Sequence, residues 1–351
     1  MTSRPGTPEE PVPGLRFPRP LPASPTIGIW TPSSPAAARF PKRFERALRA
    51  MGDDGMSVRL AEHARHDDGL FAGSPEETAE DLHRLLADPE VDAVVCVAGG
   101  YVTSRVLDHV DFDLVRSAAK PLVGYSDVSA MLWATLGRAR LSTFHGPMVV
   151  SEWGEHGGML PYTRQRFLDA LRPSGGETVL TAPGEWTDEY LHWDRDDTRP
   201  RRTRPGRWRE LVPGTARGWL LPGCAPSVAG LFGTPYLPDT TGAILCLETT
   251  GTSAEEFCGL LTQWRQSGRL DGIAGLIIGR HGQVPAGSTS EQFDRVVLEA
   301  LGTVDVPVLA DVDFGHTEPR LTLPLGLPAR LDTAGSTLTL EPVPPTTKEG
   351  T

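Results

Sequence analysis

The run VDAVVCVAGG, from Val91 to Gly100, indicates the fold class most directly. Its apolar, largely β-branched residues follow one another without alternation, which is typical of a parallel strand that is buried on both faces. A helix is predicted just before it, because Ser74 can serve as N-cap, Pro75 stands at the first helical position and Glu77 completes a capping box. A strand of this kind next to a capped helix predicts an α/β sheet.

The same alternation extends outward over residues 26–150. Three segments are predicted to be strands: TIGIW, SVRLAE and PLVGYS. Helical patterns fill three others: PKRFERALRAMG, TSRVLDHVDFDLVRSAA and SDVSAMLWATLG. We therefore predict an N-terminal doubly wound, flavodoxin-like domain with a parallel sheet.

Beyond residue 150 the pattern changes. Residues 151–215 are rich in charge and Trp and read as a connecting region with surface loops, whereas residues 216–342 alternate again and predict a second α/β domain. Pro-rich residues 1–25 and residues 343–351 are expected to be loose tails. The length of 351 residues fits about two domains.

Composition excludes several classes of function. The net charge of −11 argues against a nucleic-acid partner, because such binding rests on Lys and Arg. No apolar run is long enough to span a membrane, and the N-terminus lacks the apolar core of a secretory signal. Cys96, Cys224, Cys246 and Cys258 form no CxxC pair, so we expect free thiols and a cytoplasmic location.

Ser126 is the first candidate for chemistry. It lies at a strand-to-helix corner, Gly124-Tyr125-Ser126-Asp127-Val128, which lacks the second Gly of the usual G-x-S-x-G elbow. A helix N-terminus behind a hydroxyl favours developing negative charge. Ser126 or Asp127 could equally be a helix cap, and the corner alone does not separate these interpretations.

Three further positions stand at the ends of predicted strands. Gly99 and Gly100 could offer backbone amides to an oxyanion, or could form a simple turn. Glu248 closes the run GAILCLE, where a buried carboxylate would need a partner or the strand end would need solvent. His316 follows VPVLADV and could be a base or an ordinary loop imidazole.

The three side chains are more informative together than apart. Ligands of open α/β sheets bind at the carboxyl ends of strands, where Ser126, Glu248 and His316 are all expected. A Ser hydroxyl needs a base to become a nucleophile, and a carboxylate can orient that base. The order Ser, acid, His also occurs in α/β-hydrolases.

Weaker signals lie elsewhere. His63 and His66 stand near acidic residues but lack a third ligand pattern, so we predict no metal. Trp186 and Trp193 could contact a substrate or fill a core. The basic run from Arg199 to Arg209 is typical of a solvated loop, although it could meet a phosphate or carboxylate.

Several motifs in order resemble the LD-carboxypeptidase family of serine peptidases, which includes the microcin C immunity proteins. The resemblance covers about residues 26–332 through AGGYVTSRVLDHVDFDLV, LVGYSDVSAML, TFHGPM, GTPYLPDTTGAILCLE, LDGIAGLIIGR and VPVLADVDFGHTEPRLTLPLGLPARLD. It implies an N-terminal domain with the nucleophile, a C-terminal domain with Glu and His, a homodimer, and no metal or cofactor.

The resemblance also implies roles for individual residues. Ser126, Glu248 and His316 would form a catalytic triad, and backbone amides of Asp127 and of Gly99 or Gly100 would form an oxyanion hole. Tyr101, Trp186, Trp193 and Thr249 are candidate substrate contacts. Thr249 stands where the family often has an acidic residue, and LPGCAPS, residues 221–227, replaces a Gly-Gly-Asn-like turn.

Three functions remain open at this point. The GGY.TSR.L form and the Trp-bearing connecting region favour the microcin-immunity branch, whose members cleave an amide linking an amino acid or peptide to a nucleotide-like group. A muropeptide LD-carboxypeptidase of peptidoglycan recycling is the alternative. A catalytically silent protein that sequesters a peptide-like ligand is the third, and the intact set of Ser, Glu and His argues against it.

Overall fold

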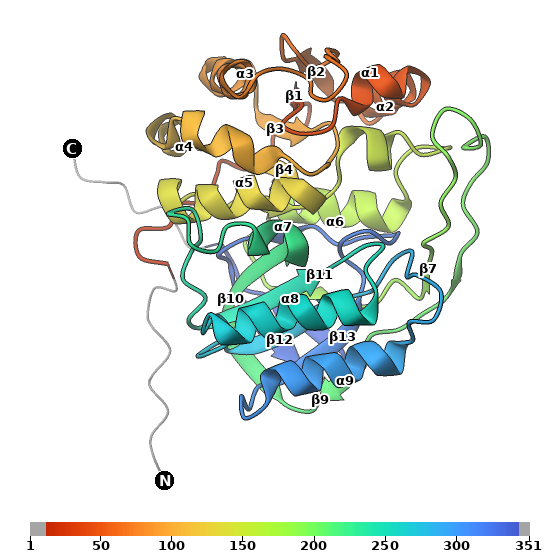
Figure 1. The fold of residues 1–351 in the computed structure, drawn as a ribbon. Helices are drawn as coiled ribbons and strands as arrows, with labels where there is room; N and C mark the ends of the chain where they lie inside the picture. Colours follow the sequence, from red (N-terminus) through yellow and green to blue (C-terminus); the bar gives the residue numbers. More distant parts are fainter. Residues whose placement is uncertain (1–11, 344–351) are drawn as a thin grey trace.

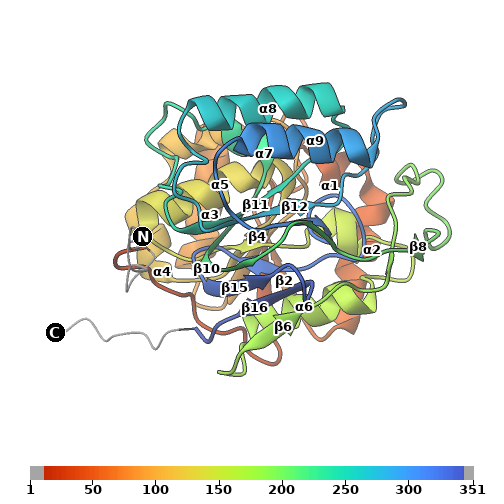
Figure 2. The same cartoon turned by 90° about the horizontal axis from the view of Figure 1, so that it is seen from below.

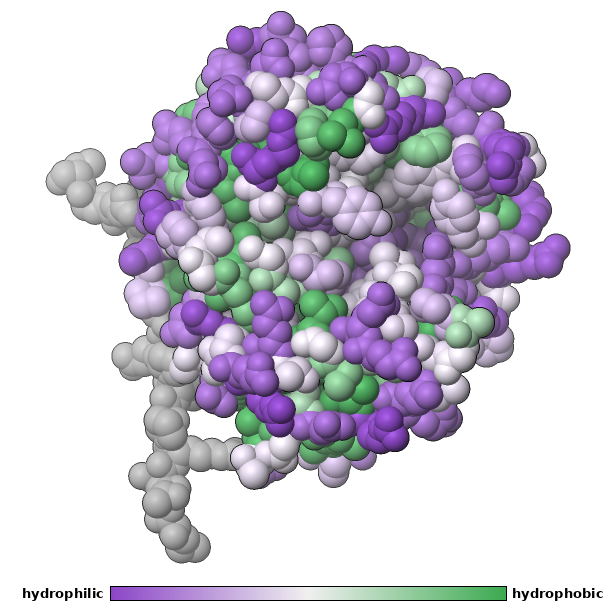
Figure 3. Space-filling view, viewed as in Figure 1, coloured by the Kyte–Doolittle hydropathy of each residue, from purple (hydrophilic) through white to green (hydrophobic). Residues whose placement is uncertain are grey.

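The computed structural model describes residues 12–343, which fold into two α/β halves that pack against each other (Figure 1). The first half is built on a six-stranded sheet and the second on an eight-stranded sheet. Among the described residues no helix is long and apolar enough to cross a membrane. Polar side chains cover much of the face in Figure 3, and apolar ones form scattered patches.

The first sheet has the strand order β14-β5-β4-β3-β1-β2. Its five N-terminal strands are parallel, and their order is that of flavodoxin-like folds, so the predicted fold class is confirmed. The run that predicted the fold forms β3, all of whose residues are buried. The strands are β1 (Thr26–Trp30), β2 (Ser57–Leu60), β3 (Ala93–Cys96), β4 (Leu122–Gly124), β5 (Phe144–His145) and β14 (Leu323–Pro324).

Helices follow the strands of this half, as the alternation predicts. The capping box at Ser74 is present, with Ser74 accepting from the Glu77 amide and the Glu77 carboxylate accepting from the Ser74 amide. The helices are α1 (Ala36–Arg39), α2 (Pro41–Asp53), α3 (Pro75–Ala87), η1 (Thr103–His109), α4 (Phe112–Ala118), η2 (Ser126–Val128), α5 (Ser129–Ala134) and η3 (Thr135–Ala139).

The second sheet has the order β6-β16-β15-β10-β11-β12-β13-β9. Its centre, β10 to β13, is parallel, and antiparallel strands flank it. Helices α8 and α9 lie along one face (Figure 2). The elements are β9 (Arg209–Val212), β10 (Thr215–Cys224), α7 (Ala225–Ala229), β11 (Ala243–Glu248), α8 (Ala254–Gln266), β12 (Gly275–Gly279), α9 (Ser290–Leu301), β13 (Val308–Val312), β15 (Pro328–Asp332) and β16 (Thr337–Leu340).

The predicted connecting region, residues 151–215, contains more regular structure than expected. It carries the end of η4 (Val149–Trp153), the helix α6 (Pro161–Leu171) and the short hairpin of β7 (Glu185–Trp186) and β8 (Arg204–Pro205). It also supplies both edge strands of the second sheet, β6 (Thr178–Leu180) and β9. Two-residue strands and edge strands leave little periodicity in a sequence, which is why the pattern looked irregular.

The predicted N-terminal tail, residues 1–25, is too long. Residues 12–25 pack on the first half: the amide of Arg16 donates to the carbonyl of Arg140 at 2.9 Å, and the side chain of Leu21 is buried. Residues 1–11, and residues 344–351 of the other predicted tail, lie outside the described residues. Free thiols were expected, and all four cysteines are free; Cys258 alone is only half-buried.

The two halves are joined by buried contacts as well as by the chain. The indole N–H of Trp133 in α5 donates to the carbonyl of Pro222 in β10 at 2.8 Å, and its ring packs edge-on against Trp264 in α8 at 5.9 Å. A Cβ on Gly223 would lie 2.8 Å from the Trp133 nitrogen, so the strand passes directly over the indole. The strand β14 also crosses from the C-terminal half into the first sheet.

We expect Trp133→Ala to destabilise the protein by about 3–5 kcal/mol, because a fully buried indole is replaced by a cavity at the junction. Trp133→Phe keeps much of the ring but loses the hydrogen bond, so its cost should be smaller. Denaturant unfolding followed by circular dichroism measures both. A Trp133→Ala protein that unfolds at the wild-type midpoint would contradict this account of the junction.

Candidate active site

Ser126 lies at a sharp corner between β4 and η2. Tyr125 is extended, with φ of −153°, and Ser126 adopts φ of +60°, a left-handed conformation that is unfavourable for a residue with a side chain. Such strain is typical of a nucleophile elbow. The helix-cap alternative does not hold, because the N-cap residues of η2 and α5 are Tyr125 and Val128, and neither helix has a capping hydrogen bond from a side chain.

The hydroxyl of Ser126 lies in a hydrogen-bonded chain with the two other predicted residues. Its Oγ is 2.9 Å from Nε2 of His316, and Nδ1 of His316 is 2.7 Å from Oε2 of Glu248. Glu248 is the last residue of β11, and His316 lies in the loop after β13. The structure therefore brings all three strand-end side chains together, with Ser126 from one half and Glu248 and His316 from the other.

Glu248 is completely buried, yet its surroundings keep it ionised. Burial by itself would raise the pKa of this carboxyl, but the attraction of His316 and the hydrogen bond to it, with smaller contributions from His145 and Cys224, hold the pKa below its ordinary value. Gly315, with φ of +91°, makes room for the carboxylate, since a Cβ there would collide with Glu248. A carboxylate held in this way can fix the tautomer of His316.

His145 lies on the other side of the same carboxylate. Its Nε2 is 4.0 Å from Oε1 of Glu248, and among the described residues neither atom has a hydrogen-bond partner. Burial lowers the pKa of His145 to about 4, so its imidazole is neutral at neutral pH. It therefore fills the space beside Glu248 without adding a second positive charge.

The predicted oxyanion residues surround the hydroxyl. A Cβ on Gly99 would lie 2.7 Å from Oγ of Ser126 and 3.3 Å from the amide nitrogen of Asp127, so these groups meet at one point. The side chain of Asp127 accepts hydrogen bonds from Ser33 Oγ and from the amide and hydroxyl of Thr103, each at 2.7 Å. These bonds fix the corner, and Gly100 packs closely against Ser33.

A cavity of about 300 Å³ opens beside Ser126. Gly99 and Ser126 line it from the first half, His316 from the second, and Trp193 and Tyr190 from the loop between β7 and β8. Of the predicted substrate contacts, Trp193 is the one in this wall.

The other predicted contacts lie elsewhere. Tyr101 is 96% exposed and is not part of the cavity wall. Trp186 is held between the guanidinium groups of Arg204 and Arg280, at 3.8 and 4.5 Å from its ring. Thr249 is buried behind the wall, and its hydroxyl oxygen is 3.2 Å from Nδ1 of His281. Successive side chains at the end of β11 point to opposite sides, so the next residue, Thr250, lines the cavity instead.

Comparison with known proteins agrees with this arrangement. Residues 27–146 match the model of the LD-carboxypeptidase N-terminal domain, and residues 217–331 match that of the C-terminal domain. A Streptomyces coelicolor protein named as a carboxypeptidase is 33% identical, over 90% of this chain and 93% of its own length. The chain belongs to the LD-carboxypeptidase family. It is thus a hydrolase of the serine carboxypeptidase type, as predicted.

Two further relatives in this family carry names that describe different functions. A Bacillus subtilis protein that carries the name of a murein peptide carboxypeptidase is 30% identical over 92% of this chain and 94% of its own. The microcin C7 self-immunity protein of Escherichia coli is 27% identical over 89% and 92%. A solved structure of that immunity protein, MccF, with glutamyl sulfamoyl guanosine has a TM-score of 0.88, 26% identity, and coverage of 93% and 98%.

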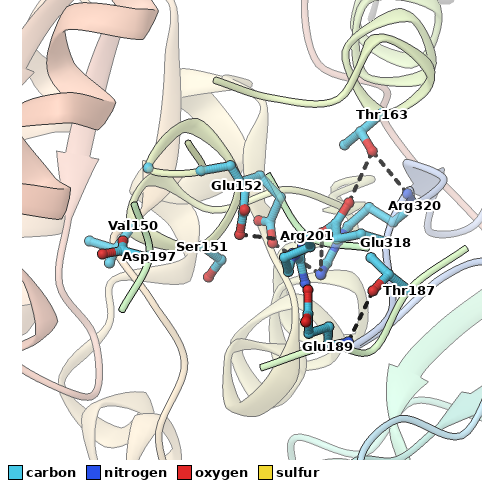
Figure 4. Close-up of polar contacts among 12 residues, drawn as sticks. Val150, Ser151, Glu152, Thr163, Thr187, Glu189, Asp197, Arg201, Glu318 and Arg320 are labelled. Atoms are coloured by element: carbon cyan, nitrogen blue, oxygen red, sulfur yellow. Dashed lines mark hydrogen bonds and ion pairs between the residues drawn. The ribbon is translucent and has the colours of Figure 1, made fainter. Parts of the chain in front are cut away.

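A buried charge cluster forms one wall of the cavity in this member of the family (Figure 4). Nη2 of Arg320 is 3.0 Å from Glu152 and 2.6 Å from Glu318, and its Nε donates to Glu318 at 2.7 Å. The Arg320 guanidinium stacks on the ring of Tyr125 at 3.8 Å, and the hydroxyl of Tyr125 donates to Glu152 at 3.2 Å. The Tyr125 ring in turn packs edge-on against His316 at 5.0 Å.

Two carboxyl groups thus share one guanidinium. Burial raises the pKa of Glu152 to about 8 against the opposing attraction of Arg320, with Glu318 adding to the rise. Burial alone would lower the pKa of Arg320, but the two carboxyl groups raise it above its ordinary value. At neutral pH the cluster therefore carries one proton on Glu152 and is close to neutral.

Among the described residues, one group of side chains has metal-ligand spacing: Cys224, Glu248 and His316, whose ligand atoms lie within 4.8 Å of one another. The set fits a metal poorly, because Glu248 and His316 already use these atoms in their mutual hydrogen bond. Burial also raises the pKa of the Cys224 thiol, whereas metals bind the thiolate. His63 instead pairs with Asp81, at 3.1 Å.

Sequence reasoning missed the residues that support the predicted ones. His145 stands in TFHGPM, so its place at a strand end was visible in the sequence, but nothing there indicated its contact with Glu248. The charge cluster of Glu152, Glu318 and Arg320 joins segments more than 160 residues apart, and no spacing rule reveals it. A burial estimate could not have found it either, since such residues are usually exposed.

We expect Glu152 to make stability depend on pH. Because its pKa rises from 4.5 to about 8 on folding, the folded protein holds a proton that the unfolded chain has released. Stability should therefore fall as pH rises from about 5 to 8, by at most about 1.4 kcal/mol per pH unit from this group. Glu152→Gln should flatten this dependence in denaturant unfolding at several pH values.

Glu299→Gln is the matched control, because Glu299 is exposed. It should keep the wild-type pH profile. A Glu152→Gln profile that runs parallel to the wild-type profile over the whole range would show that Glu152 titrates normally.

Proposed function

We propose that this protein is a serine amidohydrolase in which Ser126, His316 and Glu248 act as a catalytic triad. The hydrogen-bonded chain from Ser126 through His316 to Glu248, set in the wall of a cavity, carries the proposal. Membership of the LD-carboxypeptidase family supports the reaction class.

The first half of the reaction forms an acyl-enzyme. Ser126 Oγ attacks the carbonyl carbon of the scissile amide while Nε2 of His316, 2.9 Å away, takes its proton. Glu248 accepts from Nδ1–H of His316 and stabilises the imidazolium that forms. His316 then gives its proton to the leaving amine as the C–N bond breaks. Water, activated by His316, releases the acyl group by the same steps in reverse.

The oxyanion of the tetrahedral intermediate needs fixed donors close to Ser126. The amide of Asp127 and an amide of the Gly99-Gly100 pair are the proposed donors, because Gly99 and the Asp127 nitrogen lie against the Ser126 side chain. Backbone donors that are already oriented require no reorganisation during the reaction. The dipole of the following helix adds a small favourable term.

The proposed substrate is an amide that links an amino acid or peptide to a nucleotide-like group, and the proposed role is self-immunity or detoxification against such compounds. The likeness to MccF over most of both chains supports this choice, and MccF has been solved with glutamyl sulfamoyl guanosine and with aspartyl sulfamoyl adenosine. Tyr190 and Trp193 offer aromatic faces in the cavity wall for a planar group. A cytoplasmic homodimer remains a prediction.

Cleavage of a D-amino acid from a muropeptide is the second candidate. The 30% identity to a protein named as a murein peptide carboxypeptidase favours it. The same triad would serve, since both substrates present an amide carbonyl to Ser126. The two functions differ only in what the cavity binds on either side of the amide.

We expect Ser126→Ala to lower kcat at least about 1,000-fold on any confirmed substrate, because the nucleophile is lost. Glu248→Gln should lower kcat by roughly 10³ to 10⁴, because the amide stabilises the wrong His316 tautomer and no longer balances the imidazolium. Ser104→Ala, at an exposed position, is the control. Wild-type rates in the Ser126→Ala protein, folded by circular dichroism, would rule the triad out.

A direct comparison of substrates separates the two candidates. We expect kcat/KM for aspartyl or glutamyl sulfamoyl adenosine to exceed that for the LD-tetrapeptide by at least about tenfold, which corresponds to about 1.4 kcal/mol in transition-state binding. Mass spectrometry of the released amino acid measures both rates. A preference of similar size for the tetrapeptide would assign the protein to peptidoglycan recycling instead.

A further inference from the structure

We propose that Arg201 is a specificity-determining residue that binds a carboxylate of the substrate in the cavity beside Ser126. The inference rests on the proposed function for the identity of the substrate, but it is argued from the cavity wall alone. Three arginines, Arg43, Arg201 and Arg320, line this wall. They differ in how many of their donors are already used.

Arg43 uses four of its five N–H donors on neighbouring groups of the protein. Its Nε donates to the carbonyl of Val150 at 2.7 Å, its Nη1 pairs with Asp197 at 2.9 Å, and its Nη2 bonds both the carbonyl of Ser151 and the carboxylate of Glu155 at 2.6 Å. The side chain is only 1% exposed. Arg43 therefore holds the loop and helix segments of the wall together.

Arg320 is also committed. Its Nε and Nη2 bind Glu318 and Glu152, and one face of its guanidinium is covered by Tyr125. Its Nη1 has no partner among the described residues, but this atom is closed off from the cavity space because it is buried. A ligand could reach it only if the wall were rearranged.

Arg201 is different. Among residues 12–343 its guanidinium has one ion-pair partner, Glu155, at 3.3 Å, and its side chain is 17% exposed. A guanidinium carries five N–H donors, so most of those on Arg201 remain available. Figure 4 shows Arg201 in the middle of the polar wall, between Glu189 and Glu318.

Three other arginines of the basic run, Arg199, Arg204 and Arg209, already have partners and do not line the cavity. Arg199 makes a two-pronged pair with Glu189, at 2.9 and 2.8 Å. Arg204 covers Trp186 and pairs with Asp188, and Arg209 bridges Asp294 and Asp311. The run thus presents one guanidinium to the cavity, that of Arg201.

The carboxylates near Arg201 are shared with other guanidinium groups. Glu155 pairs with Arg43 as well as with Arg201, and Asp197 pairs with Arg43 and Arg46. Glu189 pairs with Arg199, and Glu152 and Glu318 share Arg320. Arg201 thus has no carboxylate partner of its own among the described residues, so an anion can bind it, whereas a cation would compete with Arg201 for Glu155.

The planar shape of the Arg201 guanidinium determines which kind of anion it binds best. A planar guanidinium fork matches the two oxygens of a carboxylate and bonds them in parallel. A carboxylate near the scissile amide can belong to an acidic side chain on the acyl group or to the C-terminus of the leaving amino acid. Both present the same group to Arg201, and the experiment must separate them.

The test measures binding in the Ser126→Ala background, where no ligand is consumed, by isothermal titration calorimetry. One arm compares glutamyl with glutaminyl sulfamoyl adenosine, and the other compares the LD-tetrapeptide with its C-terminal amide. Each pair differs only in the carboxylate. Arg201→Gln is compared with Arg201→Lys and with Arg207→Gln, a control at an exposed position of the same run that is not part of the wall.

Arg201→Gln should raise Kd for the carboxylate ligand of one pair at least about tenfold while changing Kd for its amide counterpart less than about twofold. Arg201→Lys should recover part of this loss, and Arg207→Gln should leave both constants unchanged. The pair that responds identifies the source of the carboxylate. Equal effects on both members of each pair, or no binding of any of the four ligands, would overturn the proposal.

Hydrolysis by the protein with Ser126 intact separates this proposal from the proposed function. A carboxylate-specific loss on Arg201→Gln, with no turnover of any ligand, would leave the carboxylate site standing and reject the hydrolase. Turnover that depends on Ser126, with no carboxylate-specific loss, would do the opposite.

Discussion

The hydrogen-bonded chain from Ser126 to Glu248 spans both halves of the molecule, and this sets the main constraint on the fold. Ser126 follows a strand of the first sheet, whereas Glu248 ends a strand of the second sheet and His316 follows another. The 2.9 Å contact between Ser126 and His316 therefore exists only while the halves keep their relative position. A displacement of about 1 Å between these two atoms would greatly weaken their contact. The packing between the halves is therefore part of the site.

Several independent contacts meet this constraint. The indole of Trp133 is anchored to β10, the amide of Cys224 donates to Ser129 at 3.0 Å, and β14 pairs with the first sheet. The loop between β7 and β8 crosses the other side of the cavity: the sandwich at Trp186 ties it to the second half, and Asp194 accepts from backbone amides at the start of α2. The cavity is thus closed on two sides by contacts that also keep Ser126, His316 and Glu248 in place.

The sequence was informative about whatever depends on local pattern. The buried run at β3, the capping box at Ser74 and the alternation of strands and helices all appear in short windows, and the strand-end rule predicted that Ser126, Glu248 and His316 would lie together. The sequence could not indicate features that depend on contacts between distant segments. Trp186 is an example: the sequence left open whether it contacts a substrate or fills a core, and its packing between Arg204 and Arg280 depends on a distant element.

The charged wall of the cavity also follows from the way the halves meet. Burying the carboxyl groups of Glu152 and Glu318 without a partner would be costly, and Arg320 offsets this only in part, since Glu152 keeps its proton up to about pH 8. Such a wall is a poor surface for an apolar ligand, because each paired charge would lose water without gaining a new partner. Among the described arginines of this wall, Arg201 has the fewest partners, so a ligand there can add a bond rather than break one. This is the physical reason for the proposal that the substrate carries an anionic group, on whichever side of the scissile amide that group stands.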